Sequence, residues 1–282
     1  IVSIFSFVVF SLTVEPTASY WDCAEYISTS AKLQVGHPPG APLFQMLGAI
    51  FSTFAFESDQ IALSINMMSV TSSALTILFL FWSISHLIKG FVSLKKHISI
   101  IEAIKIFGSS TLGSLTFTFT DSFWYNAVEA EVYAMASLIL SLLFWLGLKW
   151  VENIESERGD KWLILISFVI GLSFGVHFMG LLAIPAIGLL YYFKKYTFKL
   201  GSFLLANIIS ISILLFIFKL LLPTTLSIFG YVEVFSVNEI GLPFNYGTIF
   251  SAIILILTIY YLLNKSFREN KYMLNTITLC VT

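Results

Sequence analysis

Residues 200–222 read LGSFLLANIISISILLFIFKLLL, and Lys219 is the only ionisable side chain in this run. A helix that crosses the hydrocarbon core of a bilayer needs about 20 apolar residues in succession. The run is apolar at nearly every position, whereas the strands of a membrane barrel alternate between apolar and polar residues. The stretch therefore predicts a membrane-spanning helix, in which the backbone polar groups bond within the segment.

Similar apolar runs recur along the chain of 282 residues, of which 57% are hydrophobic and only 11% are charged. A soluble domain carries about 25% charged residues, and the mean hydropathy of +0.90 also indicates that lipid is the main solvent. We expect an all-α polytopic membrane protein with a single transmembrane domain over residues 1–282. Further spans are expected at 1–14, 64–88, 104–120, 132–150, 162–176, 178–193, 248–263 and from 272 onward.

Composition also excludes some partners. The net charge is −1 and no long basic stretch is present, so nucleic acid is not expected to bind. Cys23 and Cys280 stand far apart without the spacing of metal ligands, and no metal site is expected. Because the sequence begins and stops inside apolar runs, we expect the chain to be a fragment that is truncated at both ends.

The basic residues indicate the orientation of the spans. Under the positive-inside rule their four groups lie in the cytoplasm, so the chain must cross twice between one group and the next. This splits 162–193 into two short helices with a turn near His177. The groups are Lys89, Lys95, Lys96 and Lys105; Lys149, Arg158 and Lys161; Lys194, Lys195 and Lys199; and Lys265, Arg268 and Lys271.

The outer face then receives residues 15–60, 121–131, the His177 turn and 223–247, which are rich in acidic residues. Lys32 is the only basic residue in these stretches, while Lys219 is placed near the outer end of its helix. Residues 42–56 are short for a span, and a crossing there would invert everything downstream. We therefore expect a helix that lies at the membrane interface.

The first outer loop reads EPTASYWDCAEYISTSAKLQVGHPPGAPLF over residues 15–44. Asp22 and Glu25 are three residues apart, which places both carboxylates on one face of a helix. Trp21 and Tyr26 add aromatic surface that suits a sugar ring or a headgroup layer. The alternative is a pair of solvated acids beside an interfacial aromatic belt.

The sequence GHPPG at residues 36–40 predicts a rigid, non-helical turn, because proline fixes φ and glycine permits unusual backbone angles. His37 in this turn and Lys32 before it would meet an anionic ligand, which finds few other cations on the outer face. The alternative is a purely structural turn between two interfacial helices.

Three further motifs carry candidate residues. In DSFWYNAVEAEVYAM, residues 121–135, the acids could bind a metal, a sugar hydroxyl or only water, and Glu129 and Glu131 would point to different faces if helical. His177 in SFGVHFMG and Asn245 in GLPFNYG are each either a ligand or a structural residue. The candidate acids of the first motif are Asp121, Glu129 and Glu131.

These motifs, together with GLSFGVHFMGLLAIPAIGLLYYFKKY at residues 171–196, closely resemble bacterial membrane proteins related to eukaryotic transmembrane protein 260. That family is similar to protein O-mannosyltransferases of the type C glycosyltransferase fold. The resemblance implies a helical bundle with a large first extracytoplasmic loop that carries interfacial helices. It also implies a bacterial inner membrane and a soluble C-terminal region that is missing here.

The implied reaction moves a sugar, mannose or a similar hexose, from a polyprenyl phosphate to a protein Ser or Thr hydroxyl on the extracytoplasmic side. By position, Asp22 matches the catalytic acid and Glu25 its neighbour. Ala24 and Tyr26 stand where the family usually has glycine and phenylalanine, and neither change touches the carboxylates.

The chemistry of such a transfer is consistent with one carboxylate. A hydroxyl needs a general base, and a single carboxylate base gives displacement with inversion through an oxocarbenium-like state. Phosphate is already a good leaving group, so no metal or other cofactor is expected if Lys32 and His37 meet its charge. Membrane lipid is a further partner, and the expected substrate-binding residues are Trp21, Tyr26, Asp121, Glu129, Glu131, His177 and Asn245.

Two other functions compete with this interpretation. A transporter of a small or lipid-linked substrate would place ionisable residues along a path at mid-depth. The acids here lie at the outer rim instead, and Lys219 is the exception within the spans. A scaffold of an envelope complex, with incidental acids, is the third hypothesis.

Overall fold

The computed structural model describes residues 1–92, 98–156 and 159–269, and all regular elements in these ranges are helical. Five helices are long and apolar enough to cross a membrane, which confirms the prediction of a polytopic helical membrane protein. They are Ser58–Val92, Val132–Asn153, Phe178–Lys195, Leu200–Asn238 and Tyr246–Lys265. The run expected from 272 onward lies outside the described residues, as do Lys95, Lys96, Arg158, Lys271 and Cys280.

The chain divides into two compact units. The first contains Ile1–Lys149 and Leu172–Ala183, and the second contains Trp150–Gly171 and Ile184–Thr282. All of the predicted site residues except Asn245 belong to the first unit.

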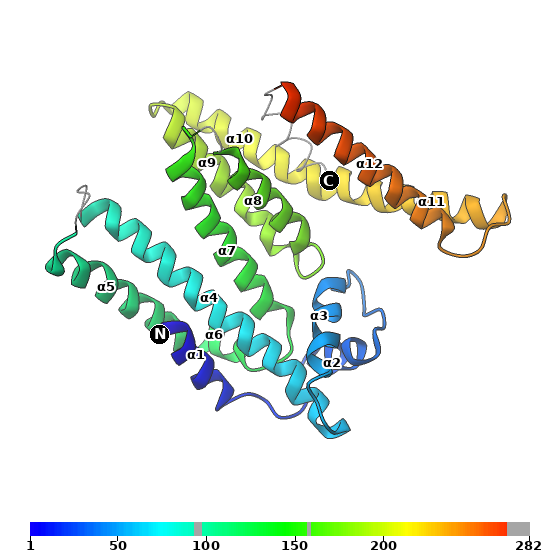
Figure 1. Cartoon of the computed structure of the whole chain (residues 1–282), viewed down its shortest axis with the longest axis horizontal. Coiled ribbons are helices and arrows are strands. Elements are labelled where there is room, and N and C mark those ends of the chain that lie inside the picture. The colour runs from blue at the N-terminus through cyan, green and yellow to red at the C-terminus, as the bar shows by residue number, and fades with distance from the viewer. Residues whose placement is uncertain (93–97, 157–158, 270–282) are drawn as a thin grey trace. The chain divides into compact units, whose positions relative to one another are not determined.

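Three helices form the frame of the first unit. α4 (Ile61–Val92) is its longest helix, and α1 (Val2–Ser11) and α5 (Ile100–Thr118) pack along it (Figure 1). Small polar residues join these helices: Ser3 Oγ donates to the Ala74 carbonyl at 2.8 Å, and the hydroxyls of Ser6 and Thr118 lie 2.9 Å apart. Such residues let apolar helices approach closely where lipid offers no competing bonds.

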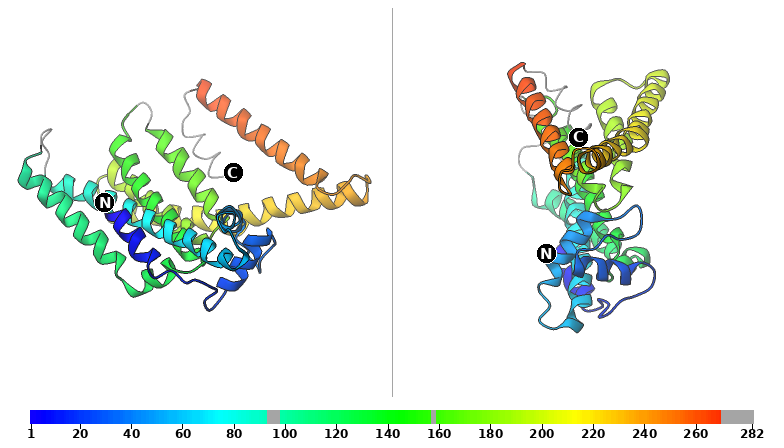
Figure 2. Two further views of the ribbon diagram at one scale, coloured as in Figure 1. Left: turned by 60° about the horizontal axis from the view of Figure 1, so that its bottom comes forward. Right: turned by 90° about the vertical axis from the view of Figure 1, so that its right-hand side faces the viewer.

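The first loop carries two short helices, α2 (Cys23–Lys32) and α3 (Pro42–Ser52), which pack against each other and against α4 (Figures 1 and 2). α3 is too short to span a bilayer at about 1.5 Å per residue, in agreement with the expected short helix over 42–56. After α3 the chain continues into α4 through a short 3₁₀ turn, η1 (Ser58–Gln60).

A buried side chain of α4, that of Asn66, binds the loop segment that leads into α2. Asn66 is fully buried, and its Nδ2 donates to the carbonyls of Glu15 at 2.6 Å and Thr17 at 2.8 Å. Its Oδ1 lies 3.9 Å from the Cys23 thiol at the start of α2. Since an unpaired buried amide is costly, this network fixes the approach to α2.

The second outer segment and the His177 turn belong to the first unit, whereas most residues of the two helices that flank this turn belong to the second. α6 (Asp121–Ala127) follows α5, and α7 (Val132–Asn153) begins four residues after Val128. α8 (Asp160–Ser173) and α9 (Ala183–Lys195) are separated by a turn with a 3₁₀ segment, η2 (Phe178–Leu182). This confirms the prediction that 162–193 is two short helices with a turn near His177.

In the second unit one helix is longer than predicted. α10 (Leu200–Phe216), a π-helical turn (η3, Ile217–Leu221) and α11 (Leu222–Asn238) form one continuous helix of 39 residues, and α12 (Tyr246–Glu269) folds back along α11 (Figure 2). Residues 223–238, expected as outer loop, are therefore helical. The π-helical turn before Pro223 accommodates a residue that cannot donate a backbone bond, so the helix continues through it.

Candidate active site

The start of α2 places Asp22 in an unusual position. Asp22 is the N-cap residue of α2, a position that aspartate favours because its carboxylate can bond to the first free N–H groups. Its side chain makes no such capping bond and is 55% exposed. Trp21 before it has φ of 61°, a left-handed conformation that is rare for an aromatic residue, and its side chain is exposed. The local backbone thus presents the Asp22 carboxylate outward.

His37 lies between the two predicted catalytic acids. Its Nδ1 is 3.0 Å from Glu25 Oε2, and its Nε2 is 3.7 Å from Asp22 Oδ2. The backbone N–H of His37 also donates to Glu25 Oε1 at 2.6 Å. This backbone bond, followed by the bond from the ring, lowers the pKa of the Glu25 carboxyl group. An imidazole can donate from both nitrogens only when it is protonated, so His37 can supply a positive charge between the two acids.

The GHPPG sequence forms the predicted turn, which the Gly40 N–H closes on the His37 carbonyl at 2.8 Å. Gly40 has φ of 78°, which favours glycine. A Cβ at Gly36 would lie 3.1 Å from Glu25 Oε1 and 2.8 Å from Gln45 Nε2. A side chain at Gly36 would therefore displace the ends of the Glu25 and Gln45 side chains.

The second outer segment, residues 121–131, is hydrogen-bonded to the first outer loop. The Glu15 N–H donates to the Val128 carbonyl at 2.9 Å, and the Ser19 hydroxyl donates to the Glu129 carboxylate. The Glu131 carboxyl group faces the backbone amide of Asp22. Different faces for Glu129 and Glu131 were expected only for a helix, and residues 128–131 are not helical: they form a bend in which the Glu131 N–H donates to the Glu129 carbonyl at 2.9 Å.

Both of these acids are buried, at 2% exposure for Glu129 and 5% for Glu131. Burial, followed by the nearby charges of Glu129 and Asp22, raises the pKa of Glu131 to about 7. Burial also raises the pKa of Glu129, although the bond from Ser19 acts in the opposite direction. The two acids of the second loop therefore differ in character from Asp22 and Glu25, which face solvent.

Aromatic rings line the same region. The Tyr26 ring centroid lies 6.3 Å from that of His37, and the Tyr133 centroid lies 5.4 Å from that of His177. Burial is the main cause that raises the pKa of Tyr26 to about 12, so its hydroxyl stays a hydrogen-bond donor. His177 Nδ1 accepts the Met179 N–H at 3.2 Å, and burial lowers the pKa of its ring. A neutral His177 then carries its proton on Nε2, which can donate to a ligand.

The turn that contains His177 is fixed to the first loop. The backbone N–H groups of Leu43 and Phe44, at the start of α3, donate to the Gly175 carbonyl at 2.7 and 3.1 Å. A Cβ at Gly175 would lie only 2.7 Å from Leu43 Cβ and 3.2 Å from Leu43 N. This close backbone approach brings His177 into the same region as His37.

Three predicted residues lie elsewhere. Lys32 is in the last turn of α2, roughly 15 Å along the helix from Asp22. Asp121 is exposed in the first turn of α6. Asn245 belongs to the second unit, where it has φ of 74° and donates its backbone N–H to Glu233 at 2.6 Å. Asn245 therefore forms part of the turn between α11 and α12.

Several residues that support the site were missed by sequence reasoning. Gln45 Nε2 donates to Thr29 Oγ1 at 3.0 Å, and this buried bond ties α3 to α2 one turn after Glu25. Ser19 and Asn66 hold the loop before Asp22. Buried polar residues in an apolar helix such as α4 were a signal for Asn66, whereas the partners of Ser19 and Gln45 depend on tertiary contacts.

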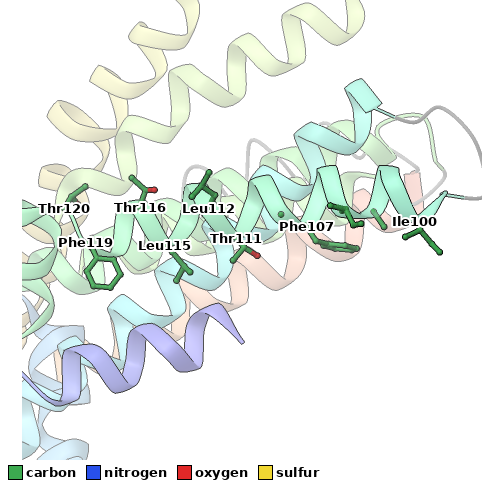
Figure 3. A pocket seen from close by; sticks show the side chains of 11 residues that line it. Ile100, Phe107, Thr111, Leu112, Leu115, Thr116, Phe119 and Thr120 are labelled. Carbon is green, nitrogen blue, oxygen red and sulfur yellow. The ribbon is translucent and has the colours of Figure 1, made fainter.

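One surface groove among the described residues is apolar, unlike the acidic cluster. It follows α5 and is lined by apolar side chains and threonines, among them Phe107, Leu112 and Phe119 (Figure 3). None of its lining residues is ionisable. The groove therefore offers no acid or base for chemistry.

The cluster at α2 has the elements of a proton-accepting site. Asp22 offers an exposed carboxylate, the His37 ring lies next to it, and Glu25 holds His37 in place. One ligand atom each from Asp22, Glu25 and His37 also lie within 4.8 Å of one another, close enough to share a cation. In the arrangement described here the imidazole occupies the space between the carboxylates.

Comparison with known proteins places this cluster inside a region that matches a known family. Residues 22–200 match the family model described as protein O-mannosyl-transferase TMEM260 N-terminal domain. The protein O-mannosyl-transferase tmem260 of Dictyostelium discoideum is 26% identical over 189 residues, which cover 63% of this chain and 21% of that protein. Its counterpart TMEM260 from Mus musculus is 27% identical over 168 residues, covering 58% and 21%. The chain thus spans about a fifth of the length of these relatives. No solved structure matches it.

Proposed function

The chain belongs to the TMEM260 N-terminal domain family, and from this premise we propose that it is the membrane part of a protein O-mannosyltransferase. The donor would be mannose or a similar hexose on a polyprenyl phosphate, and the acceptor a Ser or Thr hydroxyl of a protein. The reaction would occur on the extracytoplasmic face of the membrane, which for this chain we take to be a bacterial inner membrane. The exposed Asp22 carboxylate, freed from capping and set beside His37, is the observation that carries the proposal.

In this mechanism Asp22 is the general base. Its carboxylate accepts the proton of the acceptor hydroxyl while the hydroxyl oxygen bonds to the anomeric carbon of the sugar. The bond from that carbon to the phosphate oxygen breaks, and the polyprenyl phosphate leaves with the electron pair. A single displacement of this kind inverts the anomeric centre. Asp22 suits the role because it is exposed, whereas Glu131 and Glu129 are buried behind the loop.

The leaving phosphate needs positive charge, and the two predicted ligands are not equivalent. His37 is adjacent to Asp22, so a phosphate at the reacting carbon would lie within reach of its ring. Lys32 lies at the other end of α2 and would act mainly on the approaching donor headgroup. A cation that meets developing negative charge stabilises the transition state without a metal.

The sugar would be bound by the residues around this cation. The exposed Trp21 ring can stack on an apolar sugar face, and the hydroxyl of Tyr26 can donate to a sugar oxygen. His177 Nε2 can donate from the opposite turn, which Gly175 holds against α3. Positioning by such groups is worth several orders of magnitude in rate when the geometry is rigid.

The experiment that tests the proposal is a transfer assay with the full-length protein in proteoliposomes. A polyprenyl phosphate mannose and a Ser/Thr-rich peptide are supplied, and the mannosylated peptide is quantified. Dependence of transfer on the Asp22 carboxylate would support the proposal. Movement of the lipid-linked sugar across the bilayer without any transfer to peptide would support the transporter hypothesis instead.

A further inference from the structure

Glu131 is a buried carboxyl group directly behind Asp22. Its residue is 5% exposed, and the backbone amides of Asp22 and Val132 face its carboxyl group. Oxygen Oε1 is buried and has no hydrogen-bond partner. A buried carboxylate needs a cation or several well-placed donors to keep its charge. The surroundings of Glu131 supply too little of either.

The groups around Glu131 are acidic or neutral on each side. Asp22 and Tyr26 face it from α2 and its N-cap, Glu129 faces it from the second outer segment, and Tyr125 faces it from α6. The neighbouring charges that act on its carboxyl group, those of Glu129 and Asp22, are both negative. The pKa of Glu131, raised to about 7, agrees with this geometry. Burial and the neighbouring negative charges thus favour the neutral form of Glu131.

The backbone conformation of Trp21, close to the Glu131 carboxyl group, must be stabilised by neighbouring groups. Trp21 adopts a left-handed conformation that persists in a non-glycine residue only where the surroundings fix it. The amide of Asp22, the next residue, faces the Glu131 carboxyl group, so Glu131 lies where it can hold this turn. The neighbouring bond from Ser19 to Glu129 holds the loop three residues earlier.

We propose that Glu131 is a positioning residue for Asp22, which supports the Trp21–Asp22 turn as a neutral acid and disables the site when it loses its proton. The proposal rests on the proposed role of Asp22 as general base. An ionised Glu131 would set a second negative charge behind Asp22 in a poorly solvated place, where Coulomb repulsion is strong. That charge would also oppose the anionic phosphate of the donor.

The first test is the pH profile of transfer by the full-length protein. Wild-type transfer should fall above about pH 7, by about tenfold per pH unit once Glu131 is ionised. Glu131→Gln keeps the shape and a carbonyl acceptor without a titrating proton. Its transfer should be reduced at neutral pH but should not fall further as the pH rises. Glu131→Leu, which keeps the volume and removes the polar atoms, should lose transfer at every pH.

The control variant is Glu57→Gln, an exposed acid outside the site, which should retain the alkaline fall. If Glu131→Gln shows the same alkaline fall as the wild type, the titrating group is another residue and the proposal is wrong. If Glu131→Gln loses as much transfer as Glu131→Leu at every pH, a neutral acceptor of the same shape does not support the Trp21–Asp22 turn, which also overturns the proposal.

A second measurement does not depend on activity. Infrared difference spectra of the full-length protein should contain a protonated carboxyl band that disappears as the pH rises through about 7, and Glu131→Gln should lack this band. The band without any sugar transfer would contradict the proposed function and leave the protonated Glu131 intact. Transfer that depends on Asp22, with no such band, would contradict only the present inference.

Discussion

The Nδ1 atom of His37 lies 3.0 Å from Oε2 of Glu25, and the backbone N–H of His37 donates to Oε1 of the same carboxylate at 2.6 Å. Glu25 therefore binds His37 through both of its oxygens and aims the remaining ring nitrogen at Asp22. Twelve residues separate the two in sequence. A turn rich in proline and glycine brings them together, so the geometry of the loop determines where the His37 ring lies.

This geometry predicts unequal effects for the two candidate phosphate ligands. His37→Gln should raise the half-saturating donor concentration by about 10–100-fold, because a charge-assisted contact to phosphate is lost. Lys32→Met, which keeps the stem and removes the charge, should raise it by less than about tenfold. Initial rates are measured over a range of donor concentrations at saturating acceptor peptide. An equal or larger effect at Lys32 would show that the phosphate lies along α2, away from His37.

The backbone approach at Gly175 predicts a loss of stability. Gly175→Ala would force its Cβ against Leu43, and overpacking of this kind costs about 1–3 kcal/mol. The thermal unfolding midpoint of the detergent-solubilised protein should fall, and donor binding should weaken because His177 moves with the turn. Gly171→Ala is the matched control, because a Cβ there meets nothing within 4 Å. Equal midpoints for the two variants would contradict the close packing of this turn against α3.

The orientation of the chain predicts a labelling pattern for two exposed serines. Ser58 follows α3 in the first loop, and Ser156 follows α7 beside the basic group. Ser58→Cys should react with a membrane-impermeant maleimide added from outside, whereas Ser156→Cys should react only after the membrane is opened. The background is a variant without native cysteines. The opposite pattern would place the acidic cluster in the cytoplasm and remove the basis for an extracytoplasmic reaction.

The sequence predicted most of the helices because lipid imposes one strong requirement, that the backbone bonds be satisfied within each apolar run. The positions of the basic residues alone predicted the turn near His177. The prediction that the helix from residue 200 ends at residue 222 is wrong. Proline usually ends a helix, but a π-helical turn before Pro223 lets this one continue.

Within the candidate site, spacing on one helix was enough to pair Asp22 with Glu25. The position of His37 between them depends on a turn whose geometry was not readable from spacing. The relative directions of Glu129 and Glu131 were predictable only for a helix, and these residues instead form a bend. The burial of Glu131 behind Asp22 depends on contacts between two loops that are about 110 residues apart, as in the bond from Ser19 to Glu129.

The most direct test of the account is the effect of Asp22→Asn on sugar transfer by the full-length protein. The amide keeps the shape of the side chain, which makes no capping bond, so the thermal unfolding midpoint should change little. Loss of a general base should lower the transfer rate at saturating donor and acceptor by about 10²–10⁴-fold. Glu25→Gln is the matched comparison and should mainly raise the half-saturating donor concentration, because it releases His37. Transfer by the Asp22→Asn variant within a few-fold of the wild-type rate would contradict the assignment of Asp22 as the base.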